Sequence, residues 1–421
     1  MIKELQMRPF VRPLLVWMAG IVLQAFLPLS SCSFLLLVLP LFLLFSSFVS
    51  AKGAEVFCYG TRWLWGAVFV VLLLFLSIQK TACSQHWEEG NYGMGIFSRF
   101  SEKAQGYLLR HFEDLDLREE EKSVLATVTI GCREAMDREV RKRFSATGVA
   151  HILAVSGFHV AVVCGFLSFL LSFLPRNEPC RWIRYVSTVL LLWVFATLTG
   201  LAASAVRSAL MLTLYLTGNR LGRTVERYNV LAASAFCMLV YEPLYLFDIG
   251  FQLSYVAVLS ILYFQPRLQR LIKLRNPFLR IPWGWITVTL SAQAGTTFLC
   301  LYYFGQFSTV FLLTNLPLTL LATGLIPAGL LWMLLPAGCP GYAGLQRAVE
   351  GLTHGLFQVV DSFSRVPGAA FSFRFDLTAT AAAYGILLSL LLYVHARRPV
   401  YLLIALSLLW IVPVIRLISL K

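Results

Sequence analysis

Two histidines and a serine lie within a stretch that is otherwise apolar enough to enter a membrane. Residues 146–160 read ATGVAHILAVSGFHV, which places His151, Ser156 and His159 within nine residues. A polar side chain in hydrocarbon costs free energy unless a partner or water satisfies it. We therefore expect the stretch to face the interior of a helix bundle, where these groups either bond to neighbouring backbone or line a hydrated path. Metal binding is disfavoured because no third ligand lies nearby.

The expected helix geometry brings the two histidines to one side of this run. On a continuous helix, a step of eight residues returns to within about 80° of the starting face, so His151 and His159 would be neighbours. Ser156 and Gly157 have small side chains. They would permit close contact with another helix or a local break.

A second group of polar residues follows in the next runs. Arg207 lies in GLAASAVRSALML, and its guanidinium keeps its proton at any ordinary pH. It needs a carboxylate, carbonyls, water or a polyanionic ligand, and Asp248 is the best candidate for a structural ion pair. Asp248 also precedes Gly250 in FDIGFQLSY, where a carboxylate suits a helix N-cap. Gln252 and Ser254 carry polar groups into the run that follows.

The later runs add amides and hydroxyls. Gln293 and Thr297 lie in the run at 285–304, and Asn315 lies in the run at 309–336. The latter run contains two prolines, so it is either one tilted helix or two shorter ones. Each polar residue is a weak signal alone, because such side chains commonly hold membrane helices together. Together they predict one polar interior shared by runs four to ten.

Composition identifies the class of protein to which these residues belong. Of the 421 residues, 58% are hydrophobic and 13% are charged, whereas soluble domains carry about 25% charge. Apolar runs long enough to cross a membrane predict an all-α polytopic helix bundle with about 11–13 spans. The runs are 13–30, 33–49, 63–79, 148–174, 182–200, 201–218, 229–246, 250–264, 285–304, 309–336, 376–394 and 400–418.

The net charge of +14 is explained first by membrane topology. Lys and Arg hold loops on the cytoplasmic side of a membrane. Basic clusters occur at 3–12, 52–62, 176–184, 220–227 and 267–280, and these fall in alternate loops if the N-terminus is cytoplasmic. A capacity to attract polyanions is compatible with the same charge.

Two segments are polar enough to leave the bilayer. Within the first, residues 105–144 have helical periodicity and end in four cations, Arg138, Arg141, Lys142 and Arg143. The second, 343–366, alternates apolar and charged residues at three- and four-residue spacing, which predicts an interfacial amphipathic helix.

These features divide the chain into five expected parts. They are N-terminal transmembrane helices at 1–80, an extracytoplasmic loop and lead-in helix at 81–145, a transmembrane core at 146–336, the interfacial helix at 337–372 and a C-terminal transmembrane hairpin at 373–421.

Four separated motifs together resemble the ComEC family of competence proteins. They are HILAVSGFHVAVV (151–163), SAVRSALML (204–212), FDIGFQLSYVAVLSIL (247–262) and the polar residues of 296–317. The resemblance extends over about 105–335. Because the order and spacing of four motifs must agree, it is far more specific than any one of them.

The resemblance implies a channel in the bacterial cytoplasmic (inner) membrane that passes single-stranded DNA inward during natural transformation. A lining of Ser, Thr, Gln, His and one Arg would give the weak, repeated contacts that conduction of a polyanion requires. Arg138, Arg141, Lys142 and Arg143 would gather DNA at the outer entrance. The implied partners are single-stranded DNA, membrane lipid, a DNA receptor, a separate nuclease and a cytoplasmic motor ATPase. We expect no catalytic residue, cofactor or metal.

Two departures from the family pattern and several rival functions remain. The gap at 80–105 is too short for the family's DNA-binding barrel, and no H-x-H-x-D-H cluster for a nuclease domain occurs before Lys421. The main alternative is a secondary transporter or flippase for a small anionic substrate or lipid. An intramembrane hydrolase using Ser156 would need a nucleophile–base pair. A purely structural scaffold is the fourth reading.

Overall fold

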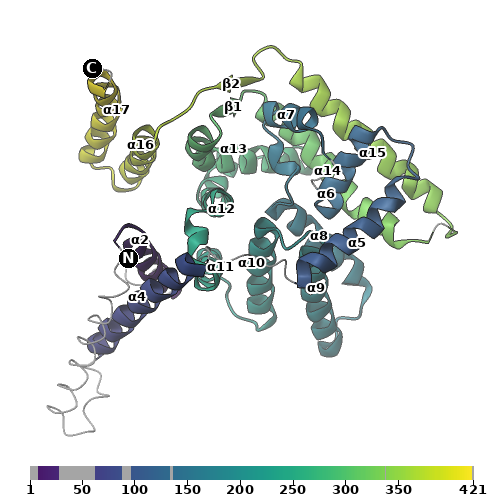
Figure 1. The fold of residues 1–421 in the computed structure, drawn as a ribbon, viewed down its shortest axis with the longest axis horizontal. Helices are drawn as coiled ribbons and strands as arrows, with labels where there is room; N and C mark the ends of the chain where they lie inside the picture. Colours follow the sequence, from purple (N-terminus) through teal and green to yellow (C-terminus); the bar gives the residue numbers. More distant parts are fainter. Residues whose placement is uncertain (1–7, 28–61, 88–95, 133–135, 337, 420–421) are drawn as a thin grey trace, which may run out of the picture. The chain divides into compact units, whose positions relative to one another are not determined.

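The computed structural model describes residues 8–27, 62–87, 96–132, 136–336 and 338–419. These residues are almost entirely helical (Figure 1), which confirms the all-α prediction. Strands among them are limited to β1 (Gln306–Ser308) and β2 (Ala370–Ser372), which pair antiparallel with Phe307 opposite Phe371. The chain forms two compact units, each made of two separate stretches of sequence.

The first unit comprises the described part of Met1–Arg110 together with Val155–Tyr255. Its core is a cluster of buried side chains in which Trp17 and Ile21 pack with Leu239 and Phe251. The indole Nε1 of Trp17 donates to the Leu239 carbonyl at 3.0 Å, which satisfies its polar atom inside this core. The helices are α2 (Val11–Phe26), α4 (Arg62–Trp87), α5 (Ile96–Phe112), α8 (Gly157–Leu170), α9 (Glu178–Leu198), α10 (Ala203–Arg220), α11 (Arg227–Tyr241) and the start of α12 (Ile249–Gln269).

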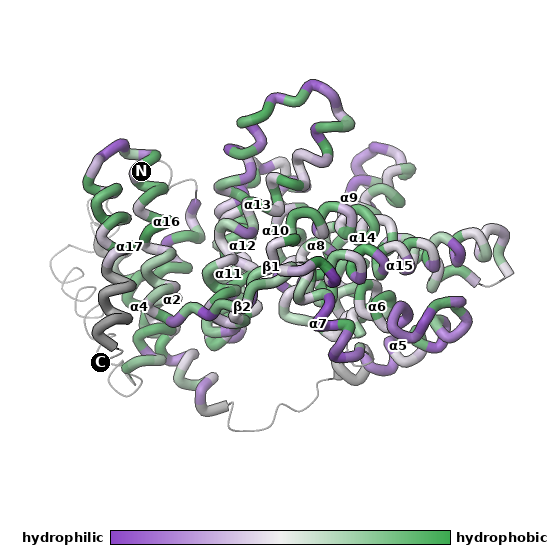
Figure 2. The backbone as a smooth tube through the Cα atoms, turned by 90° about the horizontal axis from the view of Figure 1, so that it is seen from above, coloured by the Kyte–Doolittle hydropathy of each residue, from purple (hydrophilic) through white to green (hydrophobic). Residues whose placement is uncertain are grey.

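The second unit comprises His111–Ala154 and Val256–Lys421. Its central helix is α14, which contacts α6, α13 and α15 and buries Leu318, Leu325 and Ile326. The helices are α6 (Glu119–Ile130), α7 (Arg138–Ala146), the 3-10 turn η3 (Ala150–Ile152), the rest of α12, α13 (Pro277–Tyr303), α14 (Phe311–Leu334), α15 (Tyr342–Ser364), α16 (Leu377–Ala396) and α17 (Pro399–Ser419). In Figure 2, α7 is mainly hydrophilic, whereas α14 is mainly hydrophobic.

Five of the described helices are long and apolar enough to cross a membrane, which supports a multi-pass membrane protein. They are Trp65–Gln85, Glu178–Leu198, Ile249–Gln269, Phe311–Leu334 and Leu377–Ala396. Three shorter apolar helices are Val11–Phe26, Gly157–Phe173 and Pro399–Trp410. The predicted run at 33–49 lies outside the described residues, and the predicted total of spans, the five-part domain division and the cytoplasmic N-terminus stay predictions.

Two expectations about long segments are resolved by the fold. The run at 309–336 is one helix, α14, although Pro317 and Pro327 lie inside it. The predicted amphipathic helix at 343–366 is confirmed as α15.

The single helical periodicity expected over 105–144 is wrong, because three helices share this stretch. Gly131 ends α6 with a φ of 77°, a left-handed conformation that glycine adopts without strain. Asp137 then caps α7, accepting from the amide of Glu139 at 3.4 Å. The stretch therefore forms three separate helices rather than one rod.

Candidate functional site

The first polar motif marks the point where α8 begins. Ser156 is the N-cap of α8 and forms a capping box with His159, whose Nδ1 lies 3.3 Å from the Ser156 amide and 2.9 Å from its hydroxyl. Because the amide must donate, Nδ1 acts as an acceptor there. His159 is fully buried, so the pair secures a helix start inside the protein.

The predicted side-by-side placement of the histidines on one helix is therefore wrong. His151 lies in η3, and the chain is not helical again until Gly157. The local break that Ser156 and Gly157 were expected to allow is confirmed. The eight-residue helical step between His151 and His159 does not exist, because the intervening backbone is not helical.

Helix α10 packs tightly against this break. The hydroxyl of Ser204 donates to the carbonyl of Val155. A Cβ added at Gly157 would lie 2.9 Å from Oγ of Ser208, so the observed approach uses the absence of a side chain at Gly157. The close helix contact predicted at Gly157 is thus confirmed, with α10 as the partner helix.

Arg207 lies on the same part of α10 and is only 2% exposed. Its Nη2 donates to the carbonyl of Gly250 at 2.9 Å, in the first turn of α12. The predicted direct ion pair with Asp248 does not form, because the Asp248 carboxylate accepts instead from the amide of Phe251 at 2.7 Å. The N-cap role predicted for Asp248 is confirmed, and its side chain is exposed.

The surroundings of Arg207 favour a negative charge. Its Nε and Nη1 are buried, with no hydrogen-bond partner in the part of the chain that the structure describes. The first turn of α12 meets Arg207 through the Gly250 carbonyl, and the first turn of α8 approaches Ser208 of α10 at Gly157. A helix N-terminus carries a partial positive charge, so these two helix starts add to the positive charge of Arg207. We call Arg207, the first turn of α12 and the first turn of α8 the Arg207 cluster.

The other predicted residues on α12 lie next to this cluster in the chain. Gln252 is half-buried, and its Nε2 donates to the carbonyl of Leu246 at 3.0 Å. Ser254 is half-buried in the following turn. Gln252 therefore holds the connection before α12 in place.

In the second unit, Asn315 joins three elements. Its Nδ2 donates to Thr289 Oγ1 on α13 at 2.8 Å, its Oδ1 lies 3.4 Å from the Thr319 hydroxyl, and its side chain interacts with His151 of η3. His151 itself is exposed. Thr289 was not predicted, because a threonine in an apolar run carries no distinguishing sequence signal.

The Thr297 side chain is bonded within its own helix, to the backbone of Gln293. The Thr297 hydroxyl donates to the carbonyl of Gln293 at 2.7 Å, one turn earlier in α13. Both side chains are half-buried. The structure places these two residues together but shows no contact between them and Asn315.

The four cations predicted at the DNA entrance lie on α7. Arg138, Arg141 and Lys142 are exposed. Arg143 is half-buried, and its Nη1 lies 3.5 Å from a carboxylate oxygen of Glu120 and 3.7 Å from one of Asp361. Three of the four are therefore free to meet a solute, while Arg143 reaches toward α15.

A buried carboxylate that sequence reasoning missed ties α6 to α15. The Glu121 side chain is 3% exposed, and its Oε1 lies 2.7 Å from Arg118 Nη2 and 2.8 Å from His354 Nδ1. Burial raises the pKa of Glu121, but the hydrogen bonds from Arg118 and His354 outweigh it and hold the pKa below the usual 4.5. Glu121 and His354 lie 233 positions apart, and nothing in the sequence identified them as partners.

Replacing Glu121 with glutamine is expected to remove an acid-sensitive part of the stability. A carboxyl whose pKa is lower in the folded state stabilises the protein above its unfolded pKa, and this contribution disappears as the pH falls. The difference in unfolding temperature between the wild type and E121Q should therefore be largest at neutral pH and shrink below about pH 4.5. Thermal unfolding in detergent measures it, and E119Q, at a 90% exposed carboxylate, is the control. A pH-independent difference would contradict the assignment.

No group of three or more His, Cys, Asp or Glu residues in the described stretches is arranged to hold a metal ion. The polar groups above instead suit contacts with an anion, through the Arg207 cluster and the cations of α7.

Comparisons with known proteins agree with the motif pattern. Residues 128–398, more than half of the chain, match the competence protein family. The chain is 30% identical to ComE operon protein 3 of Bacillus subtilis (strain 168) over 188 residues, 44% of this chain and 23% of the relative. It is 25% identical to the uncharacterized protein YcaI of Escherichia coli (strain K12) over 149 residues, 34% of this chain and 19% of the relative. The chain thus spans less than a quarter of either relative's length, and no solved structure matches significantly.

Proposed function

The chain belongs to the competence protein family, and from this membership we propose that it forms an inner-membrane channel that passes single-stranded DNA into the cytoplasm during natural transformation. The observation that carries the proposal is the Arg207 cluster. A buried guanidinium with two unbonded nitrogens, at the start of α12 and on the stretch of α10 that the start of α8 approaches, is a place where a passing phosphate gains favourable contacts.

The arrangement suits passage rather than tight binding. Arg207 is buried, and one of its nitrogens already donates to the Gly250 carbonyl. The exposed carboxylate of Asp248 lies close by. A phosphate would therefore meet attraction moderated by a nearby negative charge. Conduction requires binding that is favourable enough to enter and weak enough to leave.

Other residues supply the remaining contacts in this proposal. The amide of Asn315 and the exposed imidazole of His151 offer neutral hydrogen bonds in the second unit. The exposed cations of α7 attract the polyanion at the outer entrance, an attraction that salt weakens. A DNA receptor, a separate nuclease and a cytoplasmic motor ATPase would deliver, trim and pull the strand, with the N-terminus of the chain on the cytoplasmic side.

A transporter or flippase for a small anionic substrate is the second candidate. It is favoured by the mid-chain helix starts at Gly157 and Ile249, because transporters bind anions at the N-termini of interrupted helices. Neither function assigns a catalytic step to the chain. In both, Ser156 and His159 act as the cap of α8.

Uptake of labelled DNA by cells that lack this gene distinguishes the two. The channel proposal expects internalised strand to fall to background without the gene and to return when the full chain is supplied in trans. Normal internalisation in the deletion strain, with DNA still bound at the cell surface of the wild type, would overturn the channel and leave the small-anion transporter. Membrane fractionation checks that the supplied protein is present.

A further inference from the structure

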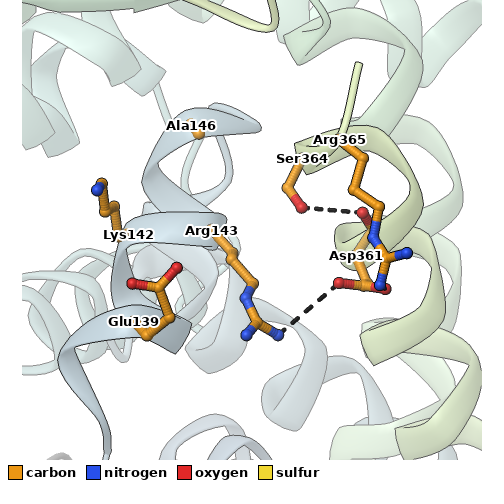
Figure 3. A pocket seen from close by; sticks show the side chains of 7 residues that line it. All are labelled: Glu139, Lys142, Arg143, Ala146, Asp361, Ser364 and Arg365. Carbon is orange, nitrogen blue, oxygen red and sulfur yellow. Dashed lines mark hydrogen bonds and ion pairs between the residues drawn. The ribbon is translucent and has the colours of Figure 1, made fainter. Parts of the chain in front are cut away.

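A solvent-open hollow of about 330 Å³ lies where α7 faces the end of α15. Arg143 of α7 extends across it toward Asp361 of α15 (Figure 3). Three cations and two carboxylates line it, so it carries a small positive excess. The lining residues are Glu139, Lys142, Arg143, Ala146, Asp361, Ser364 and Arg365.

Asp361 lies between the two arginines of the hollow and pairs with both. Its Oδ2 lies 2.6 Å from Nη2 of Arg365, one turn along α15, and its Oδ1 lies 3.7 Å from Nη1 of Arg143. The longer distance is an ion pair without a hydrogen bond. One carboxylate thus occupies the point at which two guanidinium groups converge from different helices.

These pairs are weak enough to exchange for a ligand. The Arg365 side chain is 76% exposed and Arg143 is 29% exposed, and solvent-exposed ion pairs contribute little because water and salt screen them. A phosphate group accepts paired hydrogen bonds from a planar guanidinium in a stronger, charge-assisted geometry. Either arginine can therefore leave Asp361 for a phosphate without a large loss.

We propose that this hollow binds a phosphodiester of incoming single-stranded DNA between Arg143 and Arg365, and that Asp361 is a competing anion that keeps the contact weak. The proposal rests on the proposed function, since it names a binding site for the same substrate. It adds Arg365 and Asp361, from a helix more than 200 positions along the chain, to the cations predicted on α7. A strand held here would be released as the carboxylate regains its arginines.

Binding of a fluorescent oligothymidylate to the full chain in phosphatidylcholine nanodiscs tests the site in two opposite directions. The double variant R143Q/R365Q is expected to bind about 10-fold more weakly. The steepness of the plot of log affinity against log salt should fall by about 0.7, as expected for one lost single-strand phosphate contact. D361N should bind several-fold more tightly, because Arg365 loses its carboxylate partner and Arg143 keeps only Glu120. R347Q, an exposed arginine on the same helix outside the hollow, should bind like the wild type.

Several results would overturn the site. An unchanged affinity in R143Q/R365Q, or a weaker one in correctly folded D361N, would do so, and size-exclusion profiles and unfolding temperatures report folding. If phosphatidylglycerol nanodiscs abolish the difference between the wild type and the double variant, the phosphate belongs to a lipid headgroup and the DNA assignment is wrong. Loss of uptake in the deletion strain together with normal binding by the double variant would reject the hollow and leave the channel standing. Normal uptake in the deletion strain would reject the channel, whatever the binding result.

Discussion

Replacing Arg207 with methionine is expected to lower DNA uptake roughly 100-fold, the effect of losing about 2–3 kcal/mol of hydrogen bonding to a charged group. Arg207 offers two buried nitrogens without partners in the described chain, and no other residue of the Arg207 cluster carries a positive side chain. Without it, the helix N-termini alone would meet the phosphate. Transformation frequency, normalised to the amount of protein in the membrane, measures the loss.

Methionine is chosen because it separates function from folding. A buried charge can often be replaced by a well-packed apolar side chain without loss of stability, and methionine adapts to irregular space. Within the described residues, the Arg207 side chain donates one hydrogen bond, to Gly250. We therefore expect R207M to accumulate in the membrane at close to the normal level.

The matched control lies at the other end of the same helix. Arg220 is paired with Glu178 at 2.6 Å and lies over the ring of Trp182, away from the Arg207 cluster in sequence. R220M should keep uptake within about threefold of normal, since such partly exposed pairs contribute little. Normal uptake by R207M would assign Arg207 a structural role, and so would a loss of uptake that only follows a loss of protein.

Replacing Gly295 with alanine is expected to destabilise the second unit by about 1–3 kcal/mol, the usual cost of overpacking. Gly295 lies where α13 crosses α12, and an added Cβ would come within 2.8 Å of the Cβ of Ser260. Its carbonyl also accepts from the hydroxyl of Tyr384 on α16 at 2.6 Å. Because Gly295 touches Ser260 of α12 and is bonded to Tyr384 of α16, the crossing cannot open without losing contacts. Unfolding temperature in detergent and membrane abundance measure the loss.

A second substitution, at Ser260, tests whether the close contact between α12 and α13 causes the loss of stability. Removing the opposing Cβ with S260G should restore most of the stability of G295A, because the new methyl group then occupies the vacated space. G324A, on α14, is the control, since its Cβ would meet only Leu352 at an ordinary 3.6 Å. Replacement of an interior helical glycine there is expected to be neutral or stabilising. A stable G295A, or a double variant no better than G295A, would contradict the close crossing.

Much of the local structure could be predicted from residue pattern. The hydrophobic runs located helices such as α9, α14 and α16, and three- and four-residue spacing located α15. Asp248 before Gly250 was enough to predict a helix cap. Helices and caps depend on residues only a few positions apart, so hydrophobic periodicity and capping residues predict them directly from the sequence.

Hydrophobic pattern did not reveal a change of backbone conformation inside an apolar run. Residues 152–155 are as apolar as the helix that follows, yet α8 starts only at Gly157. The reason lies elsewhere in the chain, since Ser204 of α10 takes up the carbonyl of Val155 at the break. A continuous run of hydrophobic residues therefore indicated burial correctly and helix continuity wrongly.

What the amino-acid order settled unaided is the kind of molecule: an all-helical membrane protein of the competence family, with polar residues in fixed places along its runs. Only the tertiary structure decided which groups those residues meet. It gave Arg207 the carbonyl of Gly250 instead of the Asp248 carboxylate, and it brought Asp361 to Arg143 across 218 positions. Whether a side chain is buried follows from its own polarity. The partner it meets depends on how distant helices pack against each other, and the spacing of residues within one helix does not identify that partner.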